Sequence, residues 1–211
     1  MKAEWRLPRL YTIIDVGMFE DKEKALQQTI DFAHELLEGG ATLIQYRNKK
    51  GNAREILSHA RELRRAIDAR MTLIMNDRAD LCMASGCDGV HVGQEDLSVE
   101  GVHRVLGESY FVGISTHNLK QIQHADQTAV DYIAVGPVFT TTTKTNPEPM
   151  VGLELIKAAR KATSKQIVAI GGITRTNCRS VIEAGADSVA VIGDLQDSPR
   201  KRVEEFLRVL V

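Results

Sequence analysis

Short apolar segments alternate with segments of helical periodicity along the whole chain, and this alternation limits the folds that the chain can adopt. The strands that it predicts cover residues 10–15, 41–47, 72–76, 89–92, 111–115, 132–135, 167–170 and 188–192. The predicted helices cover residues 22–37, 52–67, 79–85, 99–106, 119–127, 152–162, 177–184 and 202–210. Because the strands are almost continuously apolar, they indicate a parallel sheet covered by helices on both faces.

The number of strand–helix units favours a closed barrel. Eight such units in 211 residues are at the compact end for an α/β fold of the (β/α)8 TIM barrel type. An open doubly wound sheet is the alternative, although it more usually has fewer strands. No segment rich in proline, glycine or serine divides the chain, so residues 1–211 are predicted to form a single barrel domain.

The charge balance argues against a polyanionic partner. The 27 lysine and arginine residues face 28 aspartate and glutamate residues, which leaves a net charge of −1 and no general basic field for nucleic acid or for a membrane surface. The chain also lacks a signal-peptide pattern and an apolar run of about 20 residues. A cytoplasmic protein with small-molecule partners is therefore expected, and the sequence is compatible with a homo-oligomer.

The three cysteines carry no sign of a metal site or a disulfide framework. Cys82, Cys87 and Cys178 are odd in number and lack the spacing of zinc ligands. We interpret them as reduced residues that fill the core.

In a barrel of this kind the active site lies at the carboxyl ends of the strands. Cations, carboxylates, hydroxyl groups and glycines follow the predicted strands there, namely Gln45, Arg47, Lys49, Asn76, Asp77, Gln94, Asp96, Ser115, His117, Thr140 to Lys144, Gly171, Gly172 and Gly193. Such a set suits a phosphorylated substrate that is bound through a metal ion and cationic side chains.

Asp77 and Asp96 are candidate metal ligands because each follows a short apolar run and should reach the same end of the barrel. Two adjacent carboxylates repel one another unless a cation lies between them, and oxygen ligands suit Mg²⁺. The alternative is that Asn76 and Asp77 only cap the helix that is predicted to begin near Ala79.

Gln45, Arg47 and Lys49 alternate along a predicted strand and its extension, so they should point in one direction. They would place an amide and two cations beside the carboxylates, where they could bind phosphate groups. A solvated strand end is the alternative interpretation.

Glycine turns follow the last two predicted strands. Gly171 with Gly172, and Gly193 after Ile192, would let backbone N–H groups approach a phosphate, helped by the following helix N-terminus. Two tight connecting turns without a ligand are the alternative.

The segment from 136 to 149 is too polar for a helix and too long for a simple turn, so it is predicted to act as a lid or binding loop. An ordinary surface loop is the alternative. His117 follows Ser115 and is equally compatible with a structural and a catalytic role, whereas His91 lies inside a predicted strand and should pack within the barrel.

Several motifs together resemble the thiamine-phosphate synthase family, in order and over nearly the whole chain. They are Gln45-x-Arg47-x-Lys49, Asn76-Asp77, His91-Val92-Gly93-Gln94-x-Asp96, Ser115-Thr116-His117, Gly136-Pro137-Val138-Phe139, Thr141-x-Thr143-Lys144, Gly152-Leu153 and Ala169-Ile170-Gly171-Gly172-Ile173.

The resemblance implies a (β/α)8 transferase that joins hydroxymethylpyrimidine diphosphate to thiazole phosphate and releases pyrophosphate. Residue by residue, it implies a Mg²⁺ site at Asp77 and Asp96 and a diphosphate site at Arg47, Lys49, Asn76 and Lys144. It also implies that Gln45 hydrogen-bonds the aminopyrimidine, that Ser115 lies near that ring, and that the thiazole phosphate contacts Thr141, Thr143, Gly172, Ile192 and Gly193. The catalytic residues that it implies are Lys144, Ser115 and Arg47.

The chain departs from the family pattern at two positions. Gly193 stands where the family often has serine, and Thr140 stands where it commonly has proline. Gly193 keeps a backbone N–H for a phosphate but supplies no hydroxyl group.

Two rival functions remain open. One is a related thiazole tautomerase in which His117 acts as the acid and base, although tautomerisation has no need for the carboxylates and the threonine–lysine loop. The other is a non-catalytic barrel that senses a phosphorylated metabolite, which would need the glycine turns but not the paired carboxylates.

Overall fold

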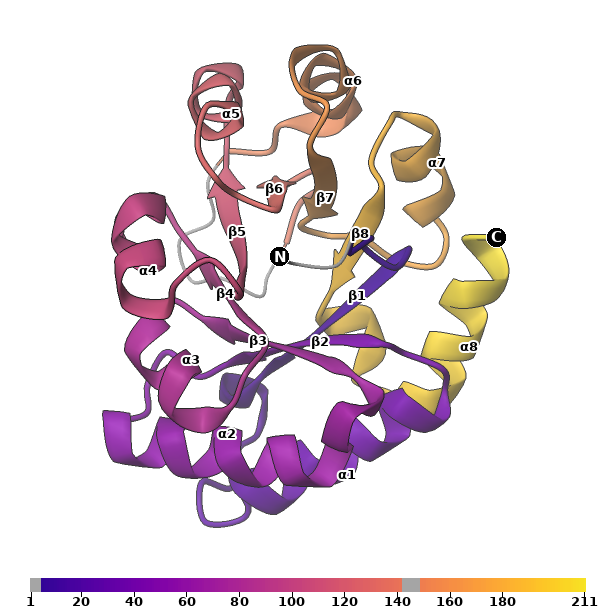
Figure 1. The fold of residues 1–211 in the computed structure, drawn as a ribbon. Coiled ribbons are helices and arrows are strands. Elements are labelled where there is room, and N and C mark those ends of the chain that lie inside the picture. The colour runs from indigo at the N-terminus through magenta and orange to yellow at the C-terminus, as the bar shows by residue number, and fades with distance from the viewer. Residues whose placement is uncertain (1–4, 142–148) are drawn as a thin grey trace.

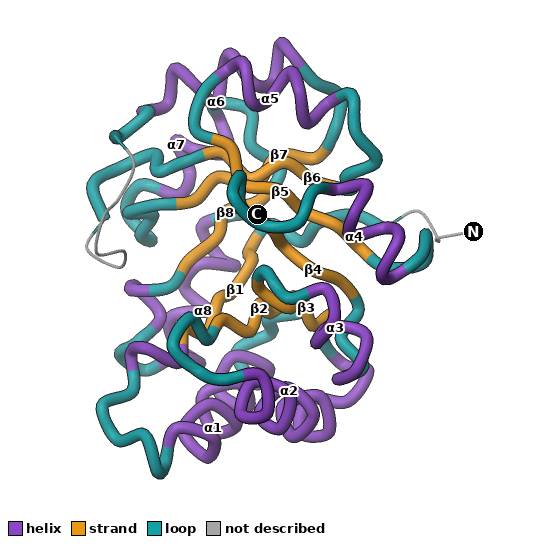
Figure 2. The backbone as a smooth tube through the Cα atoms, turned by 90° about the vertical axis from the view of Figure 1, so that its left-hand side faces the viewer, coloured by secondary structure: helices purple, strands orange, loops and turns teal. Residues whose placement is uncertain are grey.

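The chain folds into a closed ring of parallel strands with helices outside it, as the computed structural model of residues 5–141 and 149–211 shows (Figure 1). The strands pair in the order β1-β2-β3-β4-β5-β6-β7-β8, and β8 pairs with β1 to close the barrel. A view turned by 90° shows the strands surrounded by the helices (Figure 2). The prediction of a (β/α)8 barrel is confirmed.

The strands and helices lie close to their predicted ranges. The strands are β1 (Leu10–Asp15), β2 (Leu43–Arg47), β3 (Thr72–Asn76), β4 (Gly89–Val92), β5 (Phe111–Thr116), β6 (Tyr132–Val135), β7 (Gln166–Ile170) and β8 (Ser188–Val191). The helices are α1 (Ala25–Glu38), α2 (Ala53–Ile67), α3 (Ala79–Ser85), α4 (Val99–Leu106), α5 (Leu119–Asp126), α6 (Gly152–Ala162), α7 (Cys178–Glu183) and α8 (Pro199–Val209). Short 3-10 turns are η1 (Val16–Met18), η2 (Asp68–Arg70) and η3 (Gly193–Leu195).

Two helix starts differ from the prediction by more than one residue. Helix α1 begins at Ala25 rather than at residue 22, and α8 begins at Pro199 rather than at residue 202. Proline is favoured in the first helical turn because the N–H that it lacks has no helical partner there. Pro199 therefore marks the start of α8, which the apolar periodicity alone did not indicate.

The strands separate two apolar regions. One set of side chains packs outward against the helices and includes Ile14, Ile44 and Tyr46, all fully buried. The other set fills the inside of the barrel. Trp5 packs against this inner set, with its ring 4.2 Å from the ring of Phe111.

Three aspartates fix the starts of odd-numbered strands. Asp88, Asp131 and Asp187 accept hydrogen bonds from the backbone N–H groups of Leu73, Val112 and Ile167 at 2.7, 2.7 and 2.8 Å, respectively. Each aspartate lies just before the neighbouring even-numbered strand. These bonds satisfy N–H groups at the strand ends and help to hold the strands in register.

The cysteine prediction is confirmed, since Cys82, Cys87 and Cys178 are buried and free. Among the helices of the described residues, none is long and apolar enough to cross a membrane.

The position of Gly113 in the barrel interior has no room for a side chain. A Cβ atom at this position would lie 2.0 Å from Cζ of Tyr132, which is fully buried. We expect Gly113→Ala to lower the free energy of unfolding by about 1–3 kcal/mol, because the Tyr132 ring has no space to retreat into. Thermal and denaturant unfolding would measure this loss. Gly193→Ala is the matched control, since a Cβ there meets no atom within 4 Å; equal destabilisation by both changes would contradict the steric account.

Candidate active site

Two adjacent cavities open at the carboxyl ends of the strands. Their volumes are about 240 Å³ and 130 Å³. Both are lined by Ser115, His117, Ala134, Ile170, Ala190 and Ile192, which form a common wall. The arrangement therefore suits two ligands that meet at one boundary.

The smaller cavity gathers the polar residues that follow β2, β3 and β4. Its lining includes Gln45, Arg47, Lys49, Asn76, Asp77 and Asp96. The structure thus brings together the predicted amide, cations and carboxylates. Gln45 is almost fully buried, whereas Asp96 is exposed.

Asp77 occupies an unfavourable setting in the site. Its φ of 63° is in the left-handed region, which aspartate and asparagine tolerate better than most residues. Burial raises the pKa of the Asp77 carboxyl, and the nearby Asp96 carboxyl adds to this effect. The ion pair with the Lys49 ammonium acts in the opposite direction.

The helix-cap alternative for Asn76 and Asp77 is wrong. Arg78 occupies the N-cap position of α3, and no side chain caps that helix. The backbone N–H of Asp77 bonds to the carbonyl of His91 at 2.7 Å, which ties the end of β3 to β4. Both residues line the smaller cavity instead.

The donor atoms near Asp77 suit a hard cation. Two carboxylates stand side by side, and no cluster of three or more histidine, cysteine, aspartate or glutamate side chains that could hold a metal occurs among the described residues. A metal bound here would have to complete its coordination with water or ligand oxygens. Mg²⁺ is commonly held in this way, by one or two carboxylates together with phosphate oxygens.

Asp15, which the sequence analysis did not single out, supports the site through Arg47, a residue that lines the smaller cavity. Its carboxylate forms an ion pair with Arg47 and accepts a hydrogen bond from the N–H of Gly17 at 3.0 Å. The side chains of Arg47 and Asp15 are only 17% and 11% exposed, so the pair is held firmly at the cavity edge. Its place at the carboxyl end of the first strand, like that of the other site residues, was the signal that could have revealed it.

The larger cavity is lined by the glycine turns. Gly171 and Gly172 have φ values of 101° and 62°, which favour glycine. A Cβ at Gly172 would lie 2.4 Å from the carbonyl oxygen of Thr140. The loop after β6 therefore packs against this turn, and Phe139 donates a backbone hydrogen bond to Gly171 at 3.0 Å.

Helix α7 begins at Cys178, one residue after its predicted start, so residues 173–177 separate it from the first glycine turn. Asn177 bridges the interval: its amide donates to the carbonyl of Gly172 at 3.0 Å and accepts from the N–H of Thr174 at 2.8 Å. Ile192 and Gly193, which follow β8, also line this cavity.

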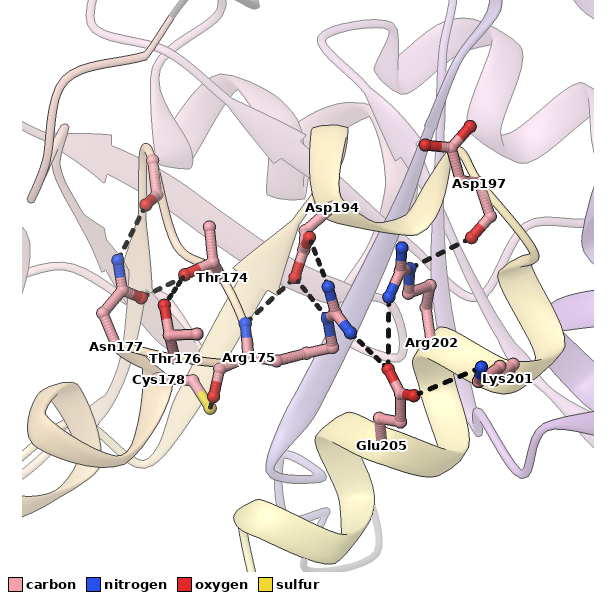
Figure 3. A network of polar contacts seen from close by, with 11 residues as sticks. Thr174, Arg175, Thr176, Asn177, Cys178, Asp194, Asp197, Lys201, Arg202 and Glu205 are labelled. Carbon is pink, nitrogen blue, oxygen red and sulfur yellow. Dashed lines mark hydrogen bonds and ion pairs between the residues drawn. The ribbon is translucent and has the colours of Figure 1, made fainter.

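A polar network joins the two glycine turns (Figure 3). Arg175, after β7, donates to the Asp194 carboxylate from its backbone N–H at 2.9 Å and from Nε at 3.0 Å. Arg175 also forms an ion pair with Glu205 of α8, and it holds the pKa of the Glu205 carboxyl below its usual range. Arg202 contacts the same carboxylate at 3.3 Å. The network fixes the spacing of the turns that line the larger cavity.

The loop after β6 is only partly described. Thr140 and Thr141 line the larger cavity, whereas the predicted site residues Thr143 and Lys144 lie outside the described residues.

The common wall is backed by a chain of buried polar side chains. Gln45, Tyr11, Tyr132, His91 and Ser115 are linked in that order by hydrogen bonds of 2.9 to 3.1 Å. His91 is buried within the barrel, as predicted. Sequence reasoning missed Tyr11 and Tyr132, which look like ordinary strand residues in the sequence.

These features define a class of protein: a (β/α)8 barrel with a cavity of carboxylates and cations next to a glycine-lined cavity at the carboxyl ends of its strands. The model of the thiamine monophosphate synthase family matches residues 10–195, most of the chain. The chain belongs to this family and is a transferase.

Relatives match over nearly their full lengths. A thiamine-phosphate synthase of Koribacter versatilis (strain Ellin345) is 60% identical, with 100% of this chain and 99% of that protein covered. One of Caldicellulosiruptor bescii (strain ATCC BAA-1888 / DSM 6725 / KCTC 15123 / Z-1320) is 36% identical, with 100% and 97% covered. The structure of thiamine phosphate pyrophosphorylase from Pyrococcus furiosus is similar with a TM-score of 0.83 and 28% identity, covering 96% of this chain and 95% of that one.

The raised pKa of Asp77 predicts a measurable effect on stability. A carboxyl whose pKa is raised on folding binds its proton more tightly in the folded state than in the unfolded state. Its contribution to the free energy of unfolding therefore falls as the pH rises above 3.8, the ordinary pKa of an aspartate. In the absence of divalent metal, we therefore expect Asp77→Asn to raise the melting temperature at neutral pH. The gain should disappear below about pH 4.

Thermal unfolding from pH 3 to pH 8 would measure the difference. Asparagine retains the tolerance of the left-handed conformation, so the change isolates the charge. A melting temperature that falls at neutral pH would show that the Lys49 ion pair outweighs burial and repulsion.

Proposed function

We propose that the protein joins 4-amino-5-hydroxymethyl-2-methylpyrimidine diphosphate to 4-methyl-5-(2-phosphoethyl)thiazole, or its carboxylated form, and releases pyrophosphate, together with CO2 when the thiazole is carboxylated. The observation that carries the proposal is the shared wall between a cavity of cations and carboxylates and a second cavity of glycine turns. Membership of the thiamine-phosphate synthase family supports the same reaction.

The smaller cavity would hold the pyrimidine diphosphate. Gln45 would hydrogen-bond the aminopyrimidine ring, while Arg47, Lys49 and Asn76 would bind the diphosphate. Arg47 and Lys49 already have their guanidinium and ammonium groups held by Asp15 and Asp77, respectively. The cations are therefore in place before the substrate arrives.

Charge counting supports a divalent ion in this cavity. Arg47 is paired with Asp15 and Lys49 with Asp77, and Asp96 lies beside Asp77, so these five ionised groups together carry a net charge of −1. A diphosphate would meet net repulsion there unless a cation were added. Asp77 and Asp96 would hold Mg²⁺, which when bound neutralises phosphate charge and stabilises the leaving group.

The larger cavity would hold the thiazole phosphate. Its phosphate group would contact Gly172, Ile192 and Gly193 together with Thr141. Thr143 would complete these contacts from the loop after β6. The network of Arg175, Asp194 and Glu205 would hold the two glycine turns at the spacing that the phosphate requires.

In the proposed reaction, the bond between the exocyclic methylene carbon and the diphosphate oxygen breaks first. Its electron pair leaves with pyrophosphate, and the amino group of the pyrimidine stabilises the positive charge on the methylene. The lone pair of the thiazole nitrogen then forms the new C–N bond. The task of the protein is to stabilise the departing charge and to align the two rings, so no nucleophilic side chain is required. Arg47 and Lys144 would stabilise the departing pyrophosphate, and Ser115 lies in the common wall where the rings would meet.

The purified protein should convert the two substrates to thiamine phosphate and pyrophosphate only when Mg²⁺ is present. Asp96→Asn should lower the Mg²⁺-dependent rate by more than about 100-fold, because one ligand charge is lost. Asparagine can still accept the hydrogen bond that Asp96 receives from the N–H of Gly93 at 2.7 Å. Single-turnover assays with and without Mg²⁺ would measure both effects.

Asp80→Asn is the matched control. The Asp80 carboxylate is exposed in α3 and, among the described residues, forms an ion pair only with Arg78. An unchanged rate in Asp96→Asn at low Mg²⁺ would remove Asp96 from the proposed metal site. Thiazole isomerisation without pyrophosphate release would instead favour the tautomerase, with His117 as its acid and base.

Gly193→Ser tests the position of the thiazole phosphate. A side chain at this position meets no atom within 4 Å, so a hydroxyl group fits at the cavity edge. A hydrogen bond to a charged phosphate should lower the KM for the thiazole phosphate by up to about tenfold. Steady-state kinetics would measure it, with the KM for the pyrimidine diphosphate as the internal control. A higher KM for the thiazole phosphate would place its phosphate group elsewhere.

A further inference from the structure

A chain of hydrogen bonds inside the barrel runs from Gln45 to Ser115, and its donors and acceptors can be assigned. Gln45 donates from Nε2 to the Tyr11 hydroxyl at 2.9 Å, and the Tyr11 and Tyr132 hydroxyls lie 3.0 Å apart. The Tyr132 hydroxyl lies 3.1 Å from Nδ1 of His91, and Nε2 of His91 lies 2.9 Å from the Ser115 hydroxyl.

Burial removes water as an alternative partner. Tyr11 and Tyr132 are 1% and 0% exposed, and burial raises the pKa of both phenols, so each stays neutral with one hydrogen to donate. Within the described part of the chain, the Tyr11 hydroxyl contacts only Gln45 and Tyr132. A buried hydroxyl hydrogen without an acceptor is costly.

The direction follows from the first donor. Since Tyr11 accepts from Gln45, its own hydrogen goes to Tyr132. The hydrogen of Tyr132 then goes to Nδ1 of His91, so this neutral ring carries its hydrogen on Nε2 and donates to Ser115. The Ser115 hydroxyl hydrogen is left to point away from His91, and Ser115 lines both cavities.

The direction of the hydrogen-bond chain also determines which donor and acceptor atoms of the Gln45 amide are available to a ligand. One hydrogen of its Nε2 is used by Tyr11, which leaves Oε1 as an acceptor beside the second hydrogen as a donor. A 4-aminopyrimidine presents the complementary pair, an amino donor beside a ring-nitrogen acceptor. A 4-oxopyrimidine presents the reverse pair.

We propose that Tyr11, Tyr132 and His91 are positioning residues that fix the donor and acceptor order at Gln45 and Ser115, and so make the site select a 4-aminopyrimidine over its 4-oxo counterpart. The inference rests on the proposed function, since it assigns the pyrimidine to the Gln45 side. To accept the 4-oxo ring, Gln45 would have to turn its amide over. Tyr11, Tyr132, His91 and Ser115 would all have to reverse, and the His91 hydrogen would have to move to Nδ1.

Selectivity is the first test. We expect wild-type protein to prefer the 4-amino over the 4-oxo pyrimidine diphosphate in kcat/KM by at least about 100-fold. Tyr132→Phe removes the acceptor of the Tyr11 hydrogen, which can then turn toward Gln45 and let the amide turn over. We expect this variant to reduce the preference by about tenfold or more, and Tyr11→Phe to do the same.

Tyr46→Phe is the matched control. Tyr46 follows Gln45 in β2 and is fully buried, but it belongs to the outer apolar region, where its hydroxyl accepts from Asn48 at 3.4 Å. It should keep the wild-type preference. The fluorescence of Trp5, the single tryptophan, reports on folding beside the site of change because its ring lies 6.2 Å from that of Tyr132.

The histidine tautomer is the second test, and it needs no substrate. The 15N NMR spectrum of the ligand-free protein should show His91 with a protonated Nε2 and an unprotonated Nδ1, assigned by its change in Tyr132→Phe. A hydrogen on Nδ1 would overturn the inference. So would an equal loss of kcat/KM for both pyrimidines in Tyr132→Phe, because that result indicates a purely structural role.

The two proposals fail in different ways. If wild-type protein turns over neither pyrimidine diphosphate, the proposed function is wrong, and the NMR experiment still decides the direction of the chain. If the 4-amino substrate is turned over and the preference is the same in wild type and Tyr132→Phe, the inference alone is wrong.

Discussion

Parallel pairing of the barrel strands is the constraint on which the site depends. Asp15 stands opposite Arg47 in the register of β1 and β2, and Asn76 stands opposite His91 in that of β3 and β4. The Asp15–Arg47 ion pair is therefore a direct consequence of strand register. A slip of one residue would move each of these side chains to the other face of the sheet, so the apolar pattern that fixes the register also assembles the charged site.

Much of this could be predicted from the sequence, because parallel strands deliver whatever follows them to one end of the barrel. Gln45, Asp77 and Asp96 were found by that rule alone, and the structure places them around one cavity. The rule cannot reveal contacts across the barrel. Tyr11 lies in β1 and Tyr132 in β6, which are not paired strands, so their hydrogen bond depends on the curvature and tilt of the closed ring.

Local sequence signals were also incomplete where tertiary packing decides the conformation. The glycines after β7 were expected to approach a phosphate, but a side chain at Gly172 would also strike the carbonyl of Thr140 in the neighbouring loop. A glycine at position 172 is therefore required by the packing of the neighbouring loop as well as expected for the approach of a phosphate. Similarly, Arg175 and Asp194 look like ordinary loop residues in sequence, yet their ion pair connects the segments that follow the two glycine turns of the larger cavity.

The charged groups of the smaller cavity are oriented by ion pairs, but Asp77 is in an unfavourable environment. Arg47 and Lys49 are oriented by carboxylates, which limits the conformational entropy that they would lose on binding an anion. The environment of Asp77 is less favourable, since this residue is half-buried, lies near a second carboxylate and has a left-handed backbone conformation. Local strain of this kind persists only where the surrounding fold imposes it. Here the backbone bond from Asp77 to His91 supplies part of that restraint, and the same residue, His91, is the inner link of the polar chain that leads to Ser115. The carboxylate pair and the proposed pyrimidine site are thus held by one strand, β4, so a displacement of that strand would disturb both at once.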